Sequence, residues 1–298
     1  MTRSVGLAHV VHQPDGTFTG VWGQHVLKSA FQPIFAFVDG KLRVAAFEGL
    51  LRPFRDQEPV SPGVFFGLIP PIDRMHVETL SRTLHLLNVG KFLDSAAAVF
   101  VNFDPSVFSD RELTDVALRD MRLVLHEAAI EPERVVCEVT EQPTASDTVL
   151  FAFVEALRGH GFRIAVDDYG SEDSDIHRIE RLLPDIVKFD ARWITQLMDT
   201  GAGFALLAEM VAAFTARGIQ TVFEGIEHGW QLELAEKSGA SMVQGFAVAR
   251  PEIVPTSFSS FKMVDRALGE TAPHSASARS HSRTPPARTF GRRAPPTA

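Results

Sequence analysis

Residues Phe162-Arg163-Ile164-Ala165-Val166 form an apolar run that stops at two consecutive aspartates, Asp167 and Asp168. A near-continuous apolar run of this length is typical of a strand buried on both faces, as in a parallel sheet. The pattern recurs along the chain, where six further apolar runs stop at an acid, an amide or a lysine: Glu48, Asn102, Glu138, Lys188, Glu224 and Gln244. The segments between the runs then decide which kind of sheet forms.

These intervening segments carry helical signals. Ser109-Asp110-Arg111-Glu112 has capping-box spacing and opens an amphipathic stretch to about Ala129. Ser61-Pro62 offers an N-cap followed by proline at the first helical position. Three more stretches are expected to be helical: residues 148–160, 203–217 and 229–239.

Strand and helix thus alternate about seven or eight times, which predicts an α/β fold of the TIM-type (β/α)8 barrel class. A doubly wound sheet is the alternative architecture. The glycine-rich phosphate loops that accompany that fold, GxGxxG and GxxxxGK[ST], do not occur in this sequence.

The chain divides into three predicted zones. Residues 1–27 form a weakly patterned N-terminal extension, and residues 28–268 form the barrel. Residues 269–298 are rich in Pro, Ser, Ala, Thr and Arg, so we expect a disordered tail that cannot bury enough apolar surface to fold.

The charge is distributed unevenly, although the whole chain carries a net charge of −8. The five arginines after Glu270 leave 24 basic against 37 acidic residues in the rest, a net charge of −13. This acidic part of the chain is not expected to bind duplex nucleic acid, because nonspecific affinity comes mainly from the attraction of basic residues to phosphates. If the protein acts on a phosphate, a cation must intervene.

The sequence predicts a cytoplasmic protein. No apolar run approaches the roughly 20 residues that span a membrane, and the first 20 residues lack the apolar stretch of a signal peptide. The single cysteine, Cys137, excludes an intramolecular disulfide and fits a reducing compartment.

The acidic strand ends predict a metal site. Barrel enzymes place catalytic groups at the C-terminal ends of strands, where five carboxylates would converge: Glu48, Glu138, Asp167, Asp168 and Glu224. Clustered carboxylates need cations, and oxygen ligands suit hard divalent ions. Adjacent aspartates would suit two metals, with Lys188 orienting a hydroxide or neutralising developing charge. Each motif alone has a plainer interpretation, since a single carboxylate can cap a helix and Asp-Asp can form a turn.

Taken in order, the motifs resemble those of EAL domains. The resemblance rests on Gln32-Pro33-Ile34, Glu48-Gly49-Leu50-Leu51-Arg52, Val101-Asn102-Phe103, Glu138-Val139-Thr140-Glu141, Asp167-Asp168-Tyr169-Gly170, Lys188-Phe189-Asp190, Glu224-Gly225-Ile226-Glu227 and Gln244-Gly245-Phe246. Gly49 stands where the family signature has alanine. The resemblance implies a modified barrel with an antiparallel first strand, which hydrolyses cyclic-di-GMP to linear pGpG with two Mg²⁺ or Mn²⁺ ions.

The resemblance also implies residue roles. Glu48, Lys188 and Glu224 would be catalytic. One metal would take Glu48, Asn102, Glu138 and Asp167, and the second would take Asp168 and Glu224 with Asp167 bridging. Substrate contacts would come from Gln32, Arg52 and Gln244, and support for the ligands and the neighbouring loop from Glu141, Glu227 and also Gln244.

One segment departs from the family pattern. Where the family continues TGxSS, a loop tied to metal binding and dimerisation, this chain has Ser171-Glu172-Asp173-Ser174-Asp175. If the glycine position needs a positive φ, Glu172 is unfavourable there. The sequence therefore leaves three hypotheses open: an active enzyme, which could form a homodimer; a catalytically impaired cyclic-di-GMP receptor or protein-interaction module; or a barrel hydrolase for another phosphodiester.

Overall fold

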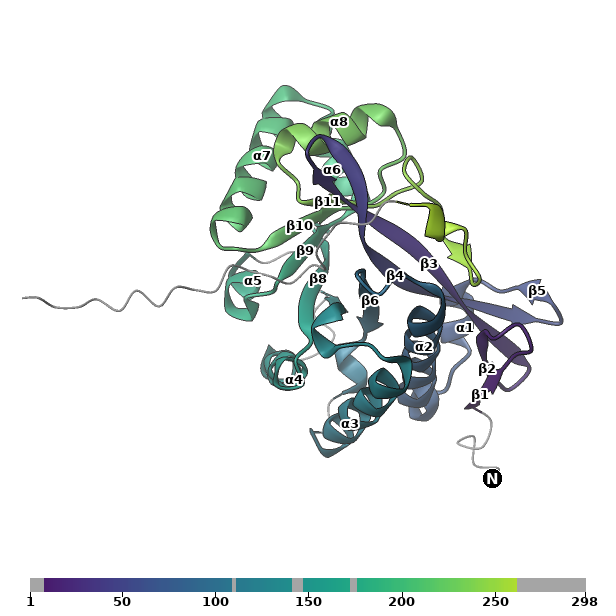
Figure 1. Ribbon diagram of the computed structural model, residues 1–298. Helices are drawn as coiled ribbons and strands as arrows, with labels where there is room; N and C mark the ends of the chain where they lie inside the picture. The colour runs from purple at the N-terminus through teal and green to yellow at the C-terminus, as the bar shows by residue number, and fades with distance from the viewer. Residues whose placement is uncertain (1–7, 109–110, 141–146, 172–175, 262–298) are drawn as a thin grey trace, which may run out of the picture.

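The computed structural model describes residues 8–108, 111–140, 147–171 and 176–261. Eight strands close a barrel (Figure 1). They are β3 (His25–Val38), β4 (Lys41–Arg55), β6 (Ala98–Phe103), β7 (Val135–Thr140), β8 (Arg163–Tyr169), β9 (Ile186–Phe189), β10 (Gln220–Phe223) and β11 (Met242–Val243).

The direction of pairing confirms the predicted modified barrel. Strand β3 is antiparallel to both of its barrel neighbours, β4 and β11, whereas the remaining barrel strands pair in parallel. The first barrel strand therefore runs against the others. A short β-bulge interrupts the β3–β4 pairing between Ile34 and Phe35.

Four of the predicted helices are confirmed with shifts of one or two residues: α3 (Arg111–Ala128), α4 (Asp147–Gly159), α7 (Gly201–Ala216) and α8 (Gly229–Ser238). Helix α1 (Pro62–Gly67) begins at the predicted cap, where the Ser61 hydroxyl accepts a hydrogen bond from the Val64 N–H. The capping box at Ser109 and Asp110 lies outside the described residues.

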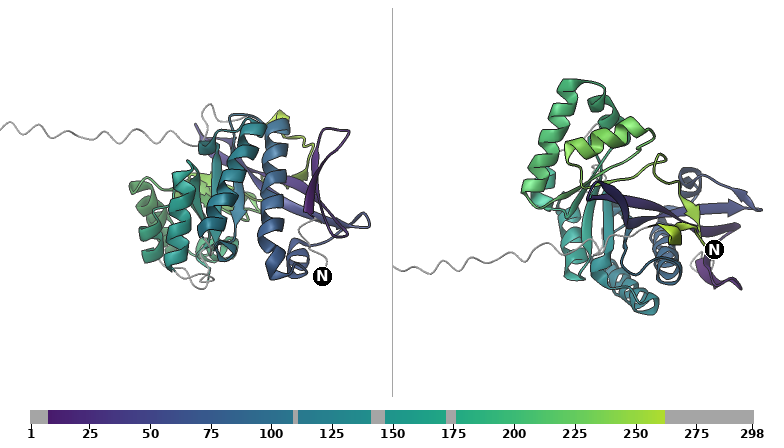
Figure 2. Two further views of the ribbon diagram at one scale, coloured as in Figure 1. Left: turned by 90° about the horizontal axis from the view of Figure 1, so that it is seen from below. Right: turned by 45° about the horizontal axis from the view of Figure 1, so that its top comes forward.

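Three helices have no counterpart in the sequence prediction: α2 (Pro71–Phe92), α5 (Ile176–Leu182) and α6 (Ala191–Met198). Helix α2 is the longest of these, and its buried residues include Ser81, Arg82, His85 and Asn88. Polar residues on a buried face obscure the apolar periodicity that reveals an amphipathic helix. The helices lie around the outside of the barrel (Figure 2).

The described part of the predicted N-terminal extension is a small antiparallel sheet. Strand β1 (Ala8–His12) pairs with β2 (Phe18–Trp22), which pairs with the start of β3. Strand β5 (Glu58–Pro59) extends the far end of β4, and β12 (Glu252–Ile253) pairs with β3. The short 3-10 helices are η2 (Pro105–Val107), η3 (Pro132–Arg134) and η4 (Phe258–Ser260). The predicted tail, residues 269–298, lies outside the described residues.

The structure explains the glycine that replaces the signature alanine. A Cβ atom at Gly49 would lie 2.8 Å from Cγ of His85. The imidazole is buried, with Nδ1 2.9 Å from the Ser29 hydroxyl and Nε2 3.2 Å from the Ser81 hydroxyl. These contacts hold the ring in place, so Gly49 and His85 fit together as a pair.

We expect Gly49→Ala to lower the free energy of unfolding by about 1–3 kcal/mol, because a methyl group would overpack the held imidazole. Urea denaturation measures the change. Gly159→Ala is the matched control, since its Cβ would meet no atom within 4 Å. Equal stability of the two variants would contradict this packing argument.

His85 also predicts a pH dependence of stability. Burial, aided by Arg52 and Arg82, lowers the pKa of His85 to about 3. Below its ordinary pKa of about 6.5, the unfolded chain binds a proton that the folded protein does not, so stability falls as the pH falls. Between pH 7 and pH 5, we expect the unfolding free energy to drop by about 2 kcal/mol more in the unmodified protein than in His85→Gln. Urea denaturation of both proteins at pH 7 and pH 5 measures this difference. An equal loss of unfolding free energy in the two proteins would refute the assignment.

Candidate active site

A ring of polar side chains lies at one end of the barrel, and strand geometry explains it. A buried apolar cluster includes one residue from each barrel strand: Ile34, Ala46, Phe100, Val136, Ala165, Ile186, Val222 and Met242. Side chains two residues apart on a strand share a face. Two residues further toward the C-terminal end of the parallel strands, the same face presents Glu48, Asn102, Glu138, Asp167, Lys188, Glu224 and Gln244, and the antiparallel β3 presents Gln32.

The sequence pattern predicted that the strand ends at Glu48, and this prediction is wrong. Strand β4 continues to Arg55 in antiparallel pairing with β3. What ends near Glu48 is the parallel pairing with β6, whose last pair is Glu48 and Phe100. Glu48 thus lies at the rim of the barrel because the pairing of β4 with β6 stops there, although both strands continue.

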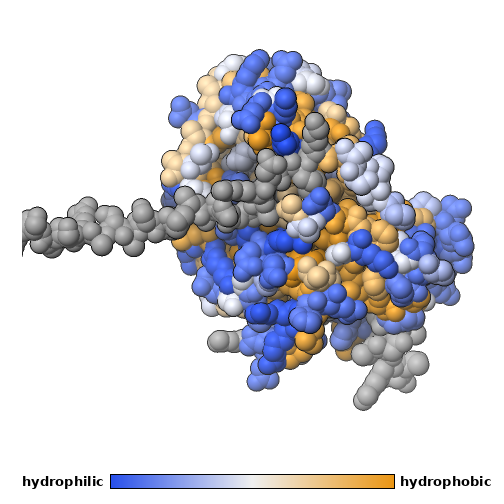
Figure 3. Space-filling model, in the orientation of Figure 1, coloured by the Kyte–Doolittle hydropathy of each residue, from blue (hydrophilic) through white to orange (hydrophobic). Residues whose placement is uncertain are grey.

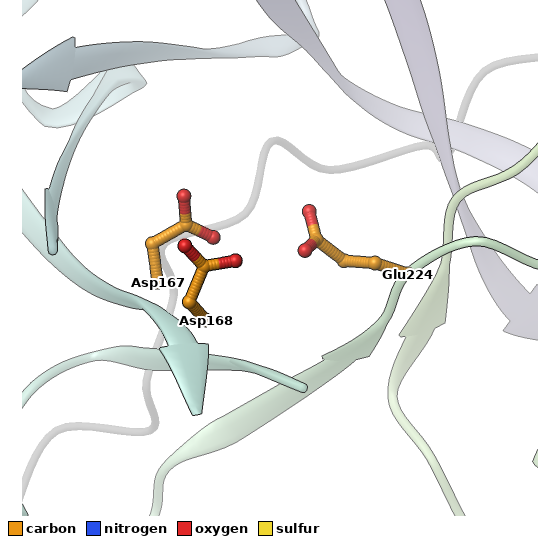
Figure 4. Close-up of side chains that lie close together, drawn as sticks. All are labelled: Asp167, Asp168 and Glu224. Carbon is orange, nitrogen blue, oxygen red and sulfur yellow. The ribbon is translucent and has the colours of Figure 1, made fainter. Parts of the chain in front are cut away.

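A backbone irregularity brings both aspartates to the rim. Consecutive strand residues normally face opposite sides. Here the β8–β9 register shifts between Val166 and Tyr169, and Asp168 has a φ of 58°. Aspartate tolerates this left-handed conformation better than most residues. Figure 4 shows the carboxylates of Asp167 and Asp168 side by side, with Glu224 opposite them.

Lys188 lies at the centre of the acidic group. Its Nζ is 2.5 Å from Glu138 Oε1, 2.7 Å from Glu224 Oε1 and 3.1 Å from Asp167 Oδ1. Glu48 Oε2 lies 3.9 Å away. The lysine side chain is only 1% exposed. Four carboxylates therefore share one buried ammonium group.

Burial and mutual repulsion shift the pKa values in this group. Burial raises the pKa of Glu138 well above its ordinary value, and burial raises the pKa of Glu224 to about 8. Burial, followed by the charge of Asp167, also raises the pKa of Asp168. Burial disfavours the charged form of Lys188, but the surrounding carboxylates outweigh it and raise the pKa of Lys188 well above its ordinary value.

The donor set fits divalent cations. Asp167, Asp168 and Glu224 each offer an oxygen, and these oxygens lie within 4.8 Å of one another. Both Glu138 oxygens and Oδ1 of Asp167 are buried without a hydrogen bond of good geometry from the described residues, although the ammonium is close. Hard cations prefer such carboxylate oxygens. The site therefore has buried carboxyl oxygens with free coordination capacity where metals would bind.

The remaining predicted residues are placed differently. Gln244 Nε2 donates to Glu48 Oε2 at 2.6 Å, whereas Gln32 Nε2 donates to the Ala249 carbonyl at 3.2 Å. Arg52 Nη1 donates to the carbonyl of Leu51 at 3.0 Å. The exposed Glu227 has its N–H bonded to Gln231, and no described contact joins its side chain to the acidic group. Glu141 lies outside the described residues.

A cavity of about 460 Å³ adjoins the rim, and sequence reasoning missed much of its wall. It is lined by β4, α1, α2 and the end of β6, including Arg52, Phe66, Glu78, Arg82, His85 and Asn102. Figure 3 shows a hydrophobic area over the region of β3, β4 and α2. The sequence contains one signal for helix α2, because Glu78 and Arg82 have opposite charges and lie four residues apart.

Comparison with known proteins now identifies the family. Residues 23–251 match the EAL domain. The chain belongs to the EAL domain family.

Two curated relatives illustrate the extent of the match to this EAL domain. YkuI from Bacillus subtilis strain 168, an uncharacterized EAL-domain containing protein, is 28% identical over 226 residues, which cover 74% of this chain and 54% of YkuI. PdeA from Escherichia coli K12, a probable cyclic di-GMP phosphodiesterase, is 29% identical over 124 residues, 41% of this chain and 17% of PdeA. The chain thus spans about half or less of these relatives.

Solved structures show the same fold. YkuI in complex with substrate c-di-GMP and calcium superposes with a TM-score of 0.66 and 26% identity, covering 76% of this chain and 56% of that chain. The PaMucR phosphodiesterase in its c-di-GMP complex gives a TM-score of 0.64 and 25% identity, covering 76% of this chain and 91% of that chain. Among the described residues, no helix has the length and apolar character to cross a membrane.

We expect Lys188→Met to lower the unfolding free energy, measured without divalent ions, by about 3 kcal/mol, because it leaves buried carboxylates uncompensated. Urea denaturation in a chelator tests this. Lys237→Met is the control, since Lys237 is 65% exposed and pairs with the exposed Glu233 at 3.7 Å. Unchanged stability of Lys188→Met would show that the lysine does not hold the acidic group together.

Proposed function

We propose that this EAL domain is a metal-dependent phosphodiesterase that hydrolyses cyclic-di-GMP to linear pGpG. The observation that carries the proposal is the group of buried carboxylates around Lys188, with three mutually close oxygens from Asp167, Asp168 and Glu224. The complexes of YkuI and PaMucR with c-di-GMP support the choice of substrate.

The proposed cofactors are two Mg²⁺ or Mn²⁺ ions. One would be held by Glu48, Asn102, Glu138 and Asp167; the other would be held by Asp167, Asp168 and Glu224. When bound, such a pair lowers the pKa of a water and stabilises charge on the phosphate oxygens. The calcium in the YkuI complex is consistent with a divalent cation at this kind of site.

The chain's own residues would position the reactants. Lys188 is assigned to hold the attacking water, because its ammonium lies between carboxylates of three separate strands or strand ends. Gln244 fixes Glu48 through its amide hydrogen bond. The partly buried guanidinium of Arg52 lines the adjoining cavity, from which it can reach a substrate phosphate.

Three further points stay predictions. The variant loop with Glu172 lies outside the described residues, so the impaired-receptor hypothesis is decided by experiment. A homodimer formed through that loop and a cytoplasmic location also remain expectations.

We expect the purified protein with Mn²⁺ to convert cyclic-di-GMP to pGpG, with Glu224→Gln lowering kcat by about 100-fold or more through loss of a metal ligand. Product chromatography measures the conversion. Glu233→Gln on the exposed face of α8 is the control and should retain full activity.

Binding of cyclic-di-GMP by folded protein without turnover in either Mg²⁺ or Mn²⁺ would overturn the enzyme proposal and support the receptor hypothesis. Turnover of other phosphodiesters in preference to cyclic-di-GMP would show that the proposed substrate is wrong.

A further inference from the structure

Strand β6 lacks a strand neighbour on one side of its final residues. On the β7 side, pairing continues from Val99 to Phe103. On the β4 side, it stops at Phe100, because β4 continues in pairing with β3. The backbone groups of β6 beyond Phe100 must therefore find other partners on that side.

A side chain of α2 supplies one of those partners. Arg82 Nη1 donates to the Asn102 carbonyl at 3.3 Å. Burial raises the pKa of Glu78, and the charge of Arg82 partly offsets this rise. Arg82 and Glu78 are themselves paired at 3.3 Å, one helical turn apart.

Arg82 imitates the donor half of one residue of a parallel strand. In a parallel pair, one residue's N–H and C=O bond to a carbonyl and an amide two residues apart on the neighbouring strand. Arg82 takes the place of the missing N–H donor to the Asn102 carbonyl, and Glu78 is its ion-pair partner.

Packing fixes the ion pair. The Arg82 and Glu78 side chains are 6% and 12% exposed. The guanidinium carbon of Arg82 lies 4.1 Å from the ring centre of Phe103 and 5.2 Å from that of Phe108. Cation–π contacts of a desolvated arginine stabilise the guanidinium in one position.

The consequence falls on Asn102. Its side chain is exposed at the rim, so its position depends on the backbone that carries it. We propose that Arg82, braced by Glu78, is a positioning residue that fixes the backbone of Asn102 and thereby aims its side chain at the proposed metal site. This inference rests on the proposed function, because it assumes that Asn102 binds a metal.

The chain offers a matched control at the other end of the same strand. Arg134 donates to the Ala97 carbonyl from Nε at 3.0 Å and from Nη2 at 2.8 Å. Ala97 immediately precedes β6, at the end of the barrel away from the acidic group. Both arginines thus hold a backbone carbonyl of one strand, but only Arg82 does so beside the rim.

The test measures Mn²⁺ affinity of the full chain by calorimetry without nucleotide, together with the melting temperature. We expect Arg82→Met to weaken Mn²⁺ binding about tenfold, as loss of residues that orient metal ligands commonly does. Arg134→Met should lower the melting temperature but leave Mn²⁺ affinity within about twofold of the unmodified protein, since Arg134 lies away from the proposed ligands.

A double-mutant cycle identifies the route. If Arg82 acts through Asn102, the double variant Arg82→Met/Asn102→Ala should bind Mn²⁺ as weakly as Asn102→Ala alone, because coupled residues are not additive. Additive losses would overturn the proposal. Arg82→Lys should fold with its charge intact but cannot hold Glu78 and the carbonyl together, so unchanged Mn²⁺ affinity in that variant would also overturn it.

These outcomes separate the two proposals. Equal Mn²⁺ affinity in the unmodified protein and Arg82→Met overturns the positioning role and leaves the phosphodiesterase intact. Absence of Mn²⁺ binding by the folded, unmodified protein overturns both.

Discussion

The structure depends on the burial of one ammonium group among four carboxylates. Lys188 is nearly inaccessible, and its Nζ is within 4 Å of Glu48, Glu138, Asp167 and Glu224. Charges of one sign held this close repel strongly unless a cation or a proton neutralises them. The lysine provides one positive charge for four acids. The remaining negative charge is what suits the site to divalent metals.

The barrel provides the rigidity that this arrangement needs. Each parallel strand buries an apolar side chain inside the barrel and presents a polar one two residues later, and the antiparallel β3 presents one two residues earlier. The polar ring therefore stands on a packed layer of hydrophobic residues. Helix α2 supports the ring from outside through polar side chains. His85 and Asn88 bond to β3 and the N-terminal strands, while Arg82 bonds to the end of β6.

Particular residues show how far sequence reasoning reached. The apolar runs before Asp167, Lys188 and Glu224 predicted parallel strands, and all three strands are present. The pattern failed at Glu48, because an apolar run cannot show where pairing with a neighbour stops. It also missed α2, because the buried face of that helix carries Ser81 and Arg82. Helix prediction relies on apolar periodicity, and polar burial removes that signal.

The sequence by itself determined the order of strands, the chemical identity of the polar ring and the family to which its motifs point. Alternation along a strand is a local property, so it can be read from residue spacing. Only the tertiary structure decided that Asp168 turns to the same side as Asp167, that His85 fills the space left by Gly49, and that Arg82 reaches the carbonyl of Asn102. Those features depend on contacts between segments far apart in the chain, which no local pattern of residues specifies.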